Sequence, residues 1–131
     1  MTVYKAFASY LNGKEGTSDL NCSYYPSQAP QDPRQKPFCI FSTRDNIPEP
    51  THGGGFTNGT IILQFDFFAN SLTDIDGAVD KFKQHFVGQS IALDATVKLA
   101  YATTDNEFDG FDEKSKLYIR SVDLNIKYIL T

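Results

Sequence analysis

The stretch that decides the fold is GTIILQFDFFANSLTDIDGAVDKFKQHFVG, residues 59–88. Residues 60–68 are rich in β-branched and aromatic side chains, which predicts a strand. One face of this strand carries four apolar residues in alternation: Ile61, Leu63, Phe65 and Phe67. Gln64 and Asp66 interrupt the other face, so we expect one fully buried face and one mixed face.

An amphipathic helix is predicted directly after this strand. Ser71 is a good N-cap, and Asp74 three positions later approximates a capping box. An apolar stripe follows at steps of three and four residues: Leu72, Ile75, Val79, Phe82 and Phe86. Gly88 is the expected end. This helix can cover the apolar face of the strand, so the two elements supply half of a two-layer core.

The rest of the chain adds a second helix and further strands. Val3, Phe7, Tyr10 and Leu11 have helical spacing, with Gly13 as a plausible stop. Besides 60–68, long strands are expected at 38–43, 91–103 and 117–130, and a short strand is expected at 20–25. The last two long strands are expected to form a hairpin around an acidic turn, 105–114. We therefore expect an α+β fold: one two-layer domain over residues 1–131, with a mostly antiparallel four-stranded sheet and the helices on one face.

Length and charge limit the classes of function. The 131 residues suffice for one domain with a substantial core and need no disulfide or metal. The net charge of −4 argues against a nucleic-acid-binding module, which needs a basic face. The charge is uneven: residues 1–65 carry five basic and five acidic groups, whereas residues 66–131 carry seven basic and eleven acidic groups, the whole excess.

The two cysteines and the start of the chain suggest an intracellular protein, or one that is assembled inside a cell. Cys22 and Cys39 lack zinc-ligand spacing, and Cys39 lies in an apolar run, which favours a small buried side chain over a disulfide. The first residues have no apolar core of a signal peptide. No apolar run approaches the roughly 20 residues of a membrane span.

No motif for catalysis or cofactor binding emerges, so we expect neither an enzyme nor a cofactor. His52 and His85 lack the context of a catalytic triad. The run from Asp105 resembles the start of an EF-hand loop, but its twelfth position is Lys116 instead of a bidentate Glu, so a solvated turn is favoured over calcium binding. The glycines at 53–55 lack a phosphate-loop pattern.

A long irregular stretch, residues 44–58, is the best candidate for an interaction loop. It contains two prolines and three consecutive glycines, and unstructured loops of this length are uncommon in compact domains unless they are functional or disordered. It is either a hairpin tip or an assembly loop that orders against a neighbour. The assembly-loop candidates are Asn46, Ile47, Glu49, Thr51, His52, Gly53, Gly54, Gly55 and Phe56.

Three segments together resemble the tail terminator (tail-completion) family of long-tailed phages and related gene-transfer particles. They are the proline-studded entry YYPSQAPQDPRQKPFCIFS, the strand–turn–helix centre ILQFDFFANSLTDIDGAVDKFKQHFVG, and the closing strand LYIRSVDLNIKYIL. In the closing strand the family's alternating pattern is matched by Asp123, Leu124, Ile126 and Tyr128. The glycine-rich loop and the acidic turn depart from the family's pattern.

This resemblance implies a structural virion protein. Family members form a hexameric ring that caps the tail tube, stops its polymerisation and joins it to the head-completion proteins, while DNA passes through the lumen. The implied partners are further copies of the chain, the tail tube protein and the connector. An acidic lumen would repel passing phosphates, and the candidates for it are Asp105, Glu107, Asp109, Asp112 and Glu113.

Two alternatives remain open. A related neck or tail-tube component has a similar small α+β architecture, but a tube protein stacks on itself without limit. A small ligand-binding or enzymatic domain would place His52, Asp66 or Tyr101 in a pocket under the 44–58 loop.

Overall fold

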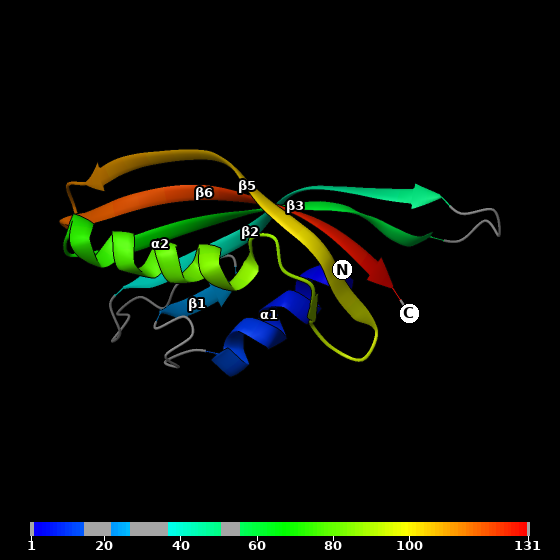
Figure 1. Ribbon diagram of the computed structural model, residues 1–131. Coiled ribbons are helices and arrows are strands. Elements are labelled where there is room, and N and C mark those ends of the chain that lie inside the picture. The colour runs from blue at the N-terminus through cyan, green and yellow to red at the C-terminus, as the bar shows by residue number, and fades with distance from the viewer. Residues whose placement is uncertain (1, 15–21, 27–36, 51–55, 131) are drawn as a thin grey trace.

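The computed structural model describes residues 2–14, 22–26, 37–50 and 56–130. They form two helices and one six-stranded sheet (Figure 1). The elements in chain order are α1 (Thr2–Lys14), β1 (Ser23–Pro26), β2 (Phe38–Pro50), β3 (Phe56–Ala69), α2 (Leu72–Phe86), β4 (Ile91–Ala92), β5 (Val97–Asp112) and β6 (Leu117–Leu130). The α+β class is therefore as expected, but the sheet has six strands where four were predicted.

The strands lie in the order β1-β2-β3-β6-β5-β4. All neighbours are antiparallel except β1 and β2, which pair in parallel. The two central strands, β3 and β6, pair over twelve residues of each. Both helices contact the sheet: α2 lies against β3, β5 and β6, and α1 lies against β1 and β5. We call the side that the helices cover the helix face and the other side the open face.

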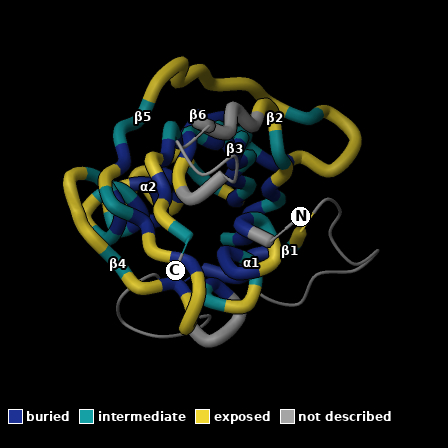
Figure 2. Tube along the Cα trace, turned by 90° about the vertical axis from the view of Figure 1, so that its right-hand side faces the viewer, coloured by how far each residue is buried: buried dark blue, intermediate teal, exposed yellow. Residues whose placement is uncertain are grey.

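Aromatic rings fill the space between the helices and the sheet. Phe65 of β3 lies 4.6 Å from Phe82 of α2 and 5.4 Å from Phe41 of β2, measured between ring centroids. Phe7 of α1 lies 5.1 Å from Phe86, so the two helices also meet through their rings. In Figure 2 the buried residues gather in the interior, between the helices and the sheet. The predicted apolar face of β3 is thus confirmed as the floor of the core.

Helix α2 begins as the sequence predicts. The hydroxyl of Ser71 accepts a hydrogen bond from the backbone N–H of Asp74 at 3.2 Å. The buried stripe differs at one position, because Leu72 is 47% exposed and Ala78 is buried in its place. Gly88 follows the helix with φ of +72°, a left-handed conformation that favours glycine.

The predicted single strand over 91–103 is wrong. It is a tight hairpin in which Ile91 of β4 pairs with Leu99 of β5. Asp94 closes the turn by accepting hydrogen bonds from the backbone N–H groups of Thr96 and Val97, which lowers its pKa. A bulge between Leu99 and Tyr101 then reverses the alternation, so that Tyr101 points outward.

Two predicted irregular stretches are largely strands. The acidic stretch 105–114 belongs mostly to β5, and the turn that follows β5 is short, residues 113–116. Of the stretch 44–58, the described residues 44–50 and 56–58 are the ends of β2 and β3, which pair with each other as far as Pro50 and Phe56. Helix α1 also runs past Gly13, its predicted stop, to Lys14.

Candidate assembly surfaces

The β2–β3 hairpin carries the predicted assembly-loop residues. The backbones of Asn46, Ile47 and Glu49 pair with Ile61, Thr60 and Asn58, so these three are strand residues and not loop residues. Phe56 opens β3. Thr51, His52, Gly53, Gly54 and Gly55 lie outside the described residues. Figure 1 shows the end of this hairpin reaching beyond both helices. The described part of the predicted loop is therefore the outer part of a β-arm formed by β2 and β3.

Two sheet edges are open in the described part of the chain. Strand β1 pairs with residues 38–41 of β2 only, and β4 pairs with Lys98 and Leu99 of β5 only. Beyond those pairs, no described strand lies along the outer side of β2 or of β5. One backbone group on the outer side of β5 is nevertheless occupied, because the carbonyl of Ala102 accepts a hydrogen bond from the N–H of Gly88. Open edges of this length can pair with strands of a neighbouring protein.

A polar network on the open face joins three strands. Asp123 of β6 is only 3% exposed, and its Oδ2 atom accepts hydrogen bonds from the guanidinium of Arg44 and from Asn106 Nδ2, the latter at 3.3 Å. Arg44 is the extra residue of a bulge in β2, and Asn106 is the extra residue of a bulge in β5. The buried carboxylate of Asp123 thus has hydrogen-bond donors from β2 and from β5, the strands that flank the central pair β3 and β6.

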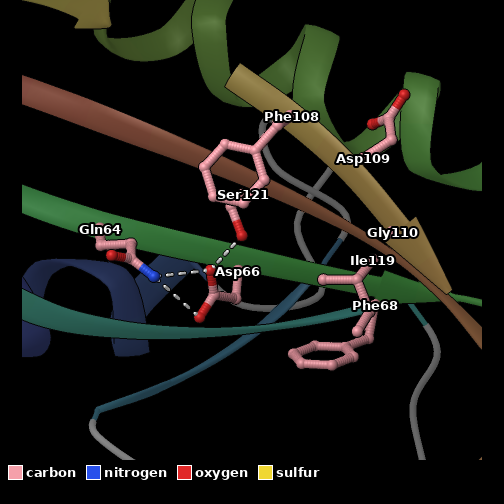
Figure 3. A pocket seen from close by; sticks show the side chains of 8 residues that line it. All are labelled: Gln64, Asp66, Phe68, Phe108, Asp109, Gly110, Ile119 and Ser121. Atoms are coloured by element: carbon pink, nitrogen blue, oxygen red, sulfur yellow. Dashed lines mark hydrogen bonds between the residues drawn. The ribbon is translucent and has the colours of Figure 1, made fainter. Parts of the chain in front are cut away.

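A pocket of about 370 Å³ lies next to this network on the open face. Its lining residues are Gln64, Asp66, Phe68, Phe108, Asp109, Gly110, Ile119 and Ser121 (Figure 3). Asp66 Oδ1 accepts hydrogen bonds from Ser121 Oγ at 2.6 Å and from Gln64 Nε2 at 3.1 Å. Asp66, named in the ligand-binding alternative, therefore does line a pocket, whereas Tyr101 is not among the lining residues.

A cluster of charged side chains on the helix face attaches α2 to β5 and β6. Arg120 of β6 donates to Asp109 of β5 at 2.6 Å and to Asp76 of α2 at 2.6 Å. Lys83 of α2 donates to Glu107 of β5 at 2.7 Å. The hydrogen bonds from Arg120 to Asp109 and Asp76 raise the pKa of the arginine above its already high usual value. This cluster holds the helix to the sheet.

The five predicted lumen residues therefore do not form one surface. Glu107 and Asp109 lie on the helix face and are paired with cations. Asp105 pairs in register with Asp123 and lies on the open face. Asp112 accepts hydrogen bonds from Lys114 N and Ser115 Oγ at the β5–β6 turn, which lowers its pKa. The bulge at Asn106 places Glu107 and Asp109 on the opposite face from Asp105, because it reverses the alternation of β5.

The described histidine and cysteine side chains, which could have served in catalysis or metal binding, pack against other parts of the fold. His85 is half-buried on α2, with Nε2 2.5 Å from the hydroxyl of Tyr10. Cys22 and Cys39 are both buried and are not joined by a disulfide, and burial raises the pKa of the Cys39 thiol. Within the described residues, no three His, Cys, Asp or Glu side chains gather as metal ligands. No helix in that part is long and apolar enough to cross a membrane.

Sequence reasoning missed the network around Asp123 and the aromatic wall of the pocket. Phe108 is 61% exposed and was treated as part of a turn. Two signals were available in the sequence. Gln64 and Asp66 interrupt the apolar strand β3, and Asp123 lies among the polar positions that alternate with apolar ones in β6. Arg44 and Asn106 gave no signal, because their roles depend on bulges that only strand pairing reveals.

Comparison with known proteins reveals similarity in structure. No protein-family model matches the chain, and no curated protein matches it in sequence. Among solved structures, the chain is similar to a chain of the virion of a native gene transfer agent (GTA) particle, with a TM-score of 0.71 and 11% sequence identity. The match covers 98% of this chain and 95% of the other. The two proteins therefore share the fold along nearly their whole lengths.

Proposed function

We propose that this chain is a structural protein of a phage-like virion, and specifically a tail terminator. In this role a ring of copies, six by the family resemblance, caps the tail tube, stops its growth and joins it to the head-completion proteins. The observation that carries the proposal is the shared fold with a chain of the gene transfer agent virion over nearly the full length of both. No catalytic step or cofactor is part of this role.

The exposed elements of the fold suit assembly into a ring. The outer edges of β2 and β5 lie on opposite sides of the sheet, so one edge of a copy can face the other edge of its neighbour. Contacts between unlike surfaces generate a closed ring when the rotation between copies closes. The β2–β3 arm, together with the candidate residues 51–55 that connect its two strands in the sequence, is proposed as a second contact with a neighbour or with the tube.

The lumen proposal follows from charge. Asp105, Asp112 and Glu113 are proposed to face the passing DNA and to repel its phosphates. Glu107 and Asp109 contribute less to such a field, because Lys83 and Arg120 neutralise them locally. The protein is accordingly expected to bind duplex DNA no better than an uncharged protein at physiological salt.

The test is native mass spectrometry of the purified chain, alone and mixed with isolated tail tubes. A terminator gives one particle of ring mass, either free or bound at a single end of each tube. Replacing residues 51–55 by Asn-Gly, which suits a two-residue hairpin turn, is expected to remove tube binding while the circular dichroism spectrum stays unchanged.

Two results would reject the terminator. Filaments of the purified chain would indicate a tube component, because a terminator must not stack on itself. A strict monomer that ignores the tubes, with an intact fold, would leave no support for a virion role and would favour a ligand-binding domain.

A further inference from the structure

We infer that the pocket on the open face binds an arginine side chain presented by a different, basic protein. The inference concerns the pocket alone and does not depend on ring formation or on tail termination. It rests on the shape of the pocket, on the unused hydrogen-bonding capacity of Asp66 and on the distribution of charge around it.

The walls of the pocket are apolar and come from three strands. Phe68 of β3, Ile119 of β6 and Phe108 of β5 surround the opening (Figure 3). Phe68 is held in place by stacking on Phe38, with ring centroids 4.9 Å apart and an interplanar angle of 9°. Phe108, in contrast, is largely exposed. A rigid wall on one side and an uncovered ring on the other suit the methylene stem and the planar head of an arginine.

Asp66 supplies the charge at the base of the pocket. Its Oδ1 atom accepts from Ser121 and Gln64, both neutral donors, while Oδ2 receives only a long contact of 3.4 Å from Gln64. An ionised carboxylate offers about four acceptor positions. Oδ2 is therefore available to a donor entering from the pocket, and a charged donor gives the stronger bond.

No cation in the described part of the chain forms an ion pair with Asp66. Arg44 pairs with Asp123, and Arg120 pairs with Asp76 and Asp109 on the helix face. Figure 3 shows Asp109 on the far side of the β5 ribbon, pointing away from Asp66. Lys127 pairs with Thr60, six residues along β3 from Asp66, which corresponds to about 20 Å of extended strand. Asp66 thus has only neutral donors among the described residues.

Charge favours a different protein over a second copy as the occupant. Residues 66–131, which supply every lining residue of the pocket except Gln64, carry the entire excess of acidic groups. A second copy approaching this region would bring a chain with the same acidic excess, whereas a basic partner is attracted to it. Arginine is favoured over lysine because its planar guanidinium can stack on Phe108 while it donates to Asp66.

The experiment is an NMR titration of the full-length ¹⁵N-labelled chain with the peptide acetyl-Gly-Arg-Gly-amide. The matched control is the same peptide with citrulline, which has nearly the same shape and no charge. We expect saturable shifts at the Gln64 side-chain amide and at Ser121 with the arginine peptide only. Asp66→Asn should weaken binding by about tenfold, the value of one charge-assisted hydrogen bond. Phe108→Ala should weaken it several-fold.

Asp105→Asn is the control variant, since it removes the same charge from the same face outside the pocket lining; binding should change by less than about twofold. Equal binding of the citrulline peptide, or unchanged binding by Asp66→Asn, would overturn the inference. Analytical ultracentrifugation of the chain without peptide tests whether a second copy of the chain occupies the pocket. Self-association that Asp66→Asn abolishes would show that a second copy fills the pocket and would also overturn it. A ring that fails to form leaves these outcomes unaffected.

Discussion

At the scale of single residues, one buried carboxylate organises the open face of the sheet. Asp123 is reached by the extra residues of two bulges, Arg44 in β2 and Asn106 in β5. Asn106 has φ of +44°, a conformation that asparagine tolerates better than most residues. Because bulges bend and twist their strands, this network determines where the outer parts of β2 and β5 point.

Removing the cation from this network should destabilise the protein. In Arg44→Met the carboxylate of Asp123 stays buried with Asn106 as its remaining donor, and we expect a loss of about 1–2 kcal/mol, since Arg44 is itself half-exposed. Urea unfolding measures it. Lys98→Met, an exposed cation of the same sheet, should change stability by less than about 0.5 kcal/mol. Additive effects of Arg44→Met and Asp123→Asn would contradict the pairing.

Cys39 makes stability depend on alkaline pH. Burial raises the pKa of its thiol in the folded protein, whereas in the unfolded chain the thiol ionises near pH ~8.5. The contribution of the neutral thiol is therefore complete below that pH and is lost as pH rises above it. We expect this group to lower stability by at most ~1.4 kcal/mol per pH unit as pH rises from ~8.5 to ~10. In Cys39→Ala this part of the slope should disappear from urea unfolding curves; an identical slope would refute the assignment.

At the scale of elements, α2 is held by two different kinds of contact. Its apolar stripe packs on β3 through Phe82 and Phe86, and its polar flank is joined to β5 and β6 through Lys83 and Asp76. The apolar contacts carry most of the free energy, because the ion pairs are partly exposed and such pairs contribute little.

The N-cap of α2 is expected to contribute about 1 kcal/mol. Ser71→Ala removes the hydroxyl that accepts from Asp74 N and leaves an N–H of the first turn unsatisfied. Urea unfolding should show the loss, and amide exchange at Asp74 should become faster. Thr73→Ala alters an exposed residue of the same turn outside the cap bond and should be close to neutral. Equal effects of the two changes would contradict the capping role.

The β5–β6 turn is expected to loosen in acid. The hydroxyl of Ser115 and the N–H of Lys114 bind the carboxylate of Asp112 and lower its pKa in the folded protein. The turn is therefore fully stabilised above the unfolded value of about 3.9 and loses this stabilisation as pH falls through the lower folded value. Chemical shifts of Lys114 and Ser115 should follow this titration. In Asp112→Asn they should be independent of pH over the same interval.

At the scale of the whole molecule, one aromatic cluster unites both helices with the sheet. Phe65 lies within ring-contact distance of α1, α2, β1 and β2 through Phe7, Phe82, Tyr24 and Phe41. Because these contacts span every layer of the molecule, the loss of this ring weakens all of them at once. The open face depends much less on aromatic burial.

Phe65→Ala should therefore cost about 3–5 kcal/mol, a large fraction of the 5–15 kcal/mol that a domain of this kind has in total. Phe108→Ala, an exposed ring of the open face, should cost less than about 1 kcal/mol. Thermal unfolding followed by circular dichroism compares the two. Similar melting temperatures for both variants would show that Phe65 is not the centre of the core.

Some elements were predictable because their signals are local. The alternation at 60–68 and the capped stripe after Ser71 identified β3 and α2, and the alternation at 117–130 identified β6. The full lengths of β2 and β5 were not predictable. Prolines, glycines and acidic residues are typical of loops, but here pairing with a neighbouring strand keeps these segments extended within the sheet. In the candidate pocket, Gln64 and Asp66 could be singled out from the sequence, because they interrupt an apolar strand.

The sequence by itself determined the α+β class, the buried face of β3 and the helix that covers it, because these depend on the periodicity of side chains within one segment. Only the tertiary structure decided the six-stranded order, the two bulges, the meeting of Arg44, Asn106 and Asp123, and the pocket above Asp66. These features depend on which distant strands pair and in which register. A shift of one residue in β5 moves every following side chain to the other face of the sheet.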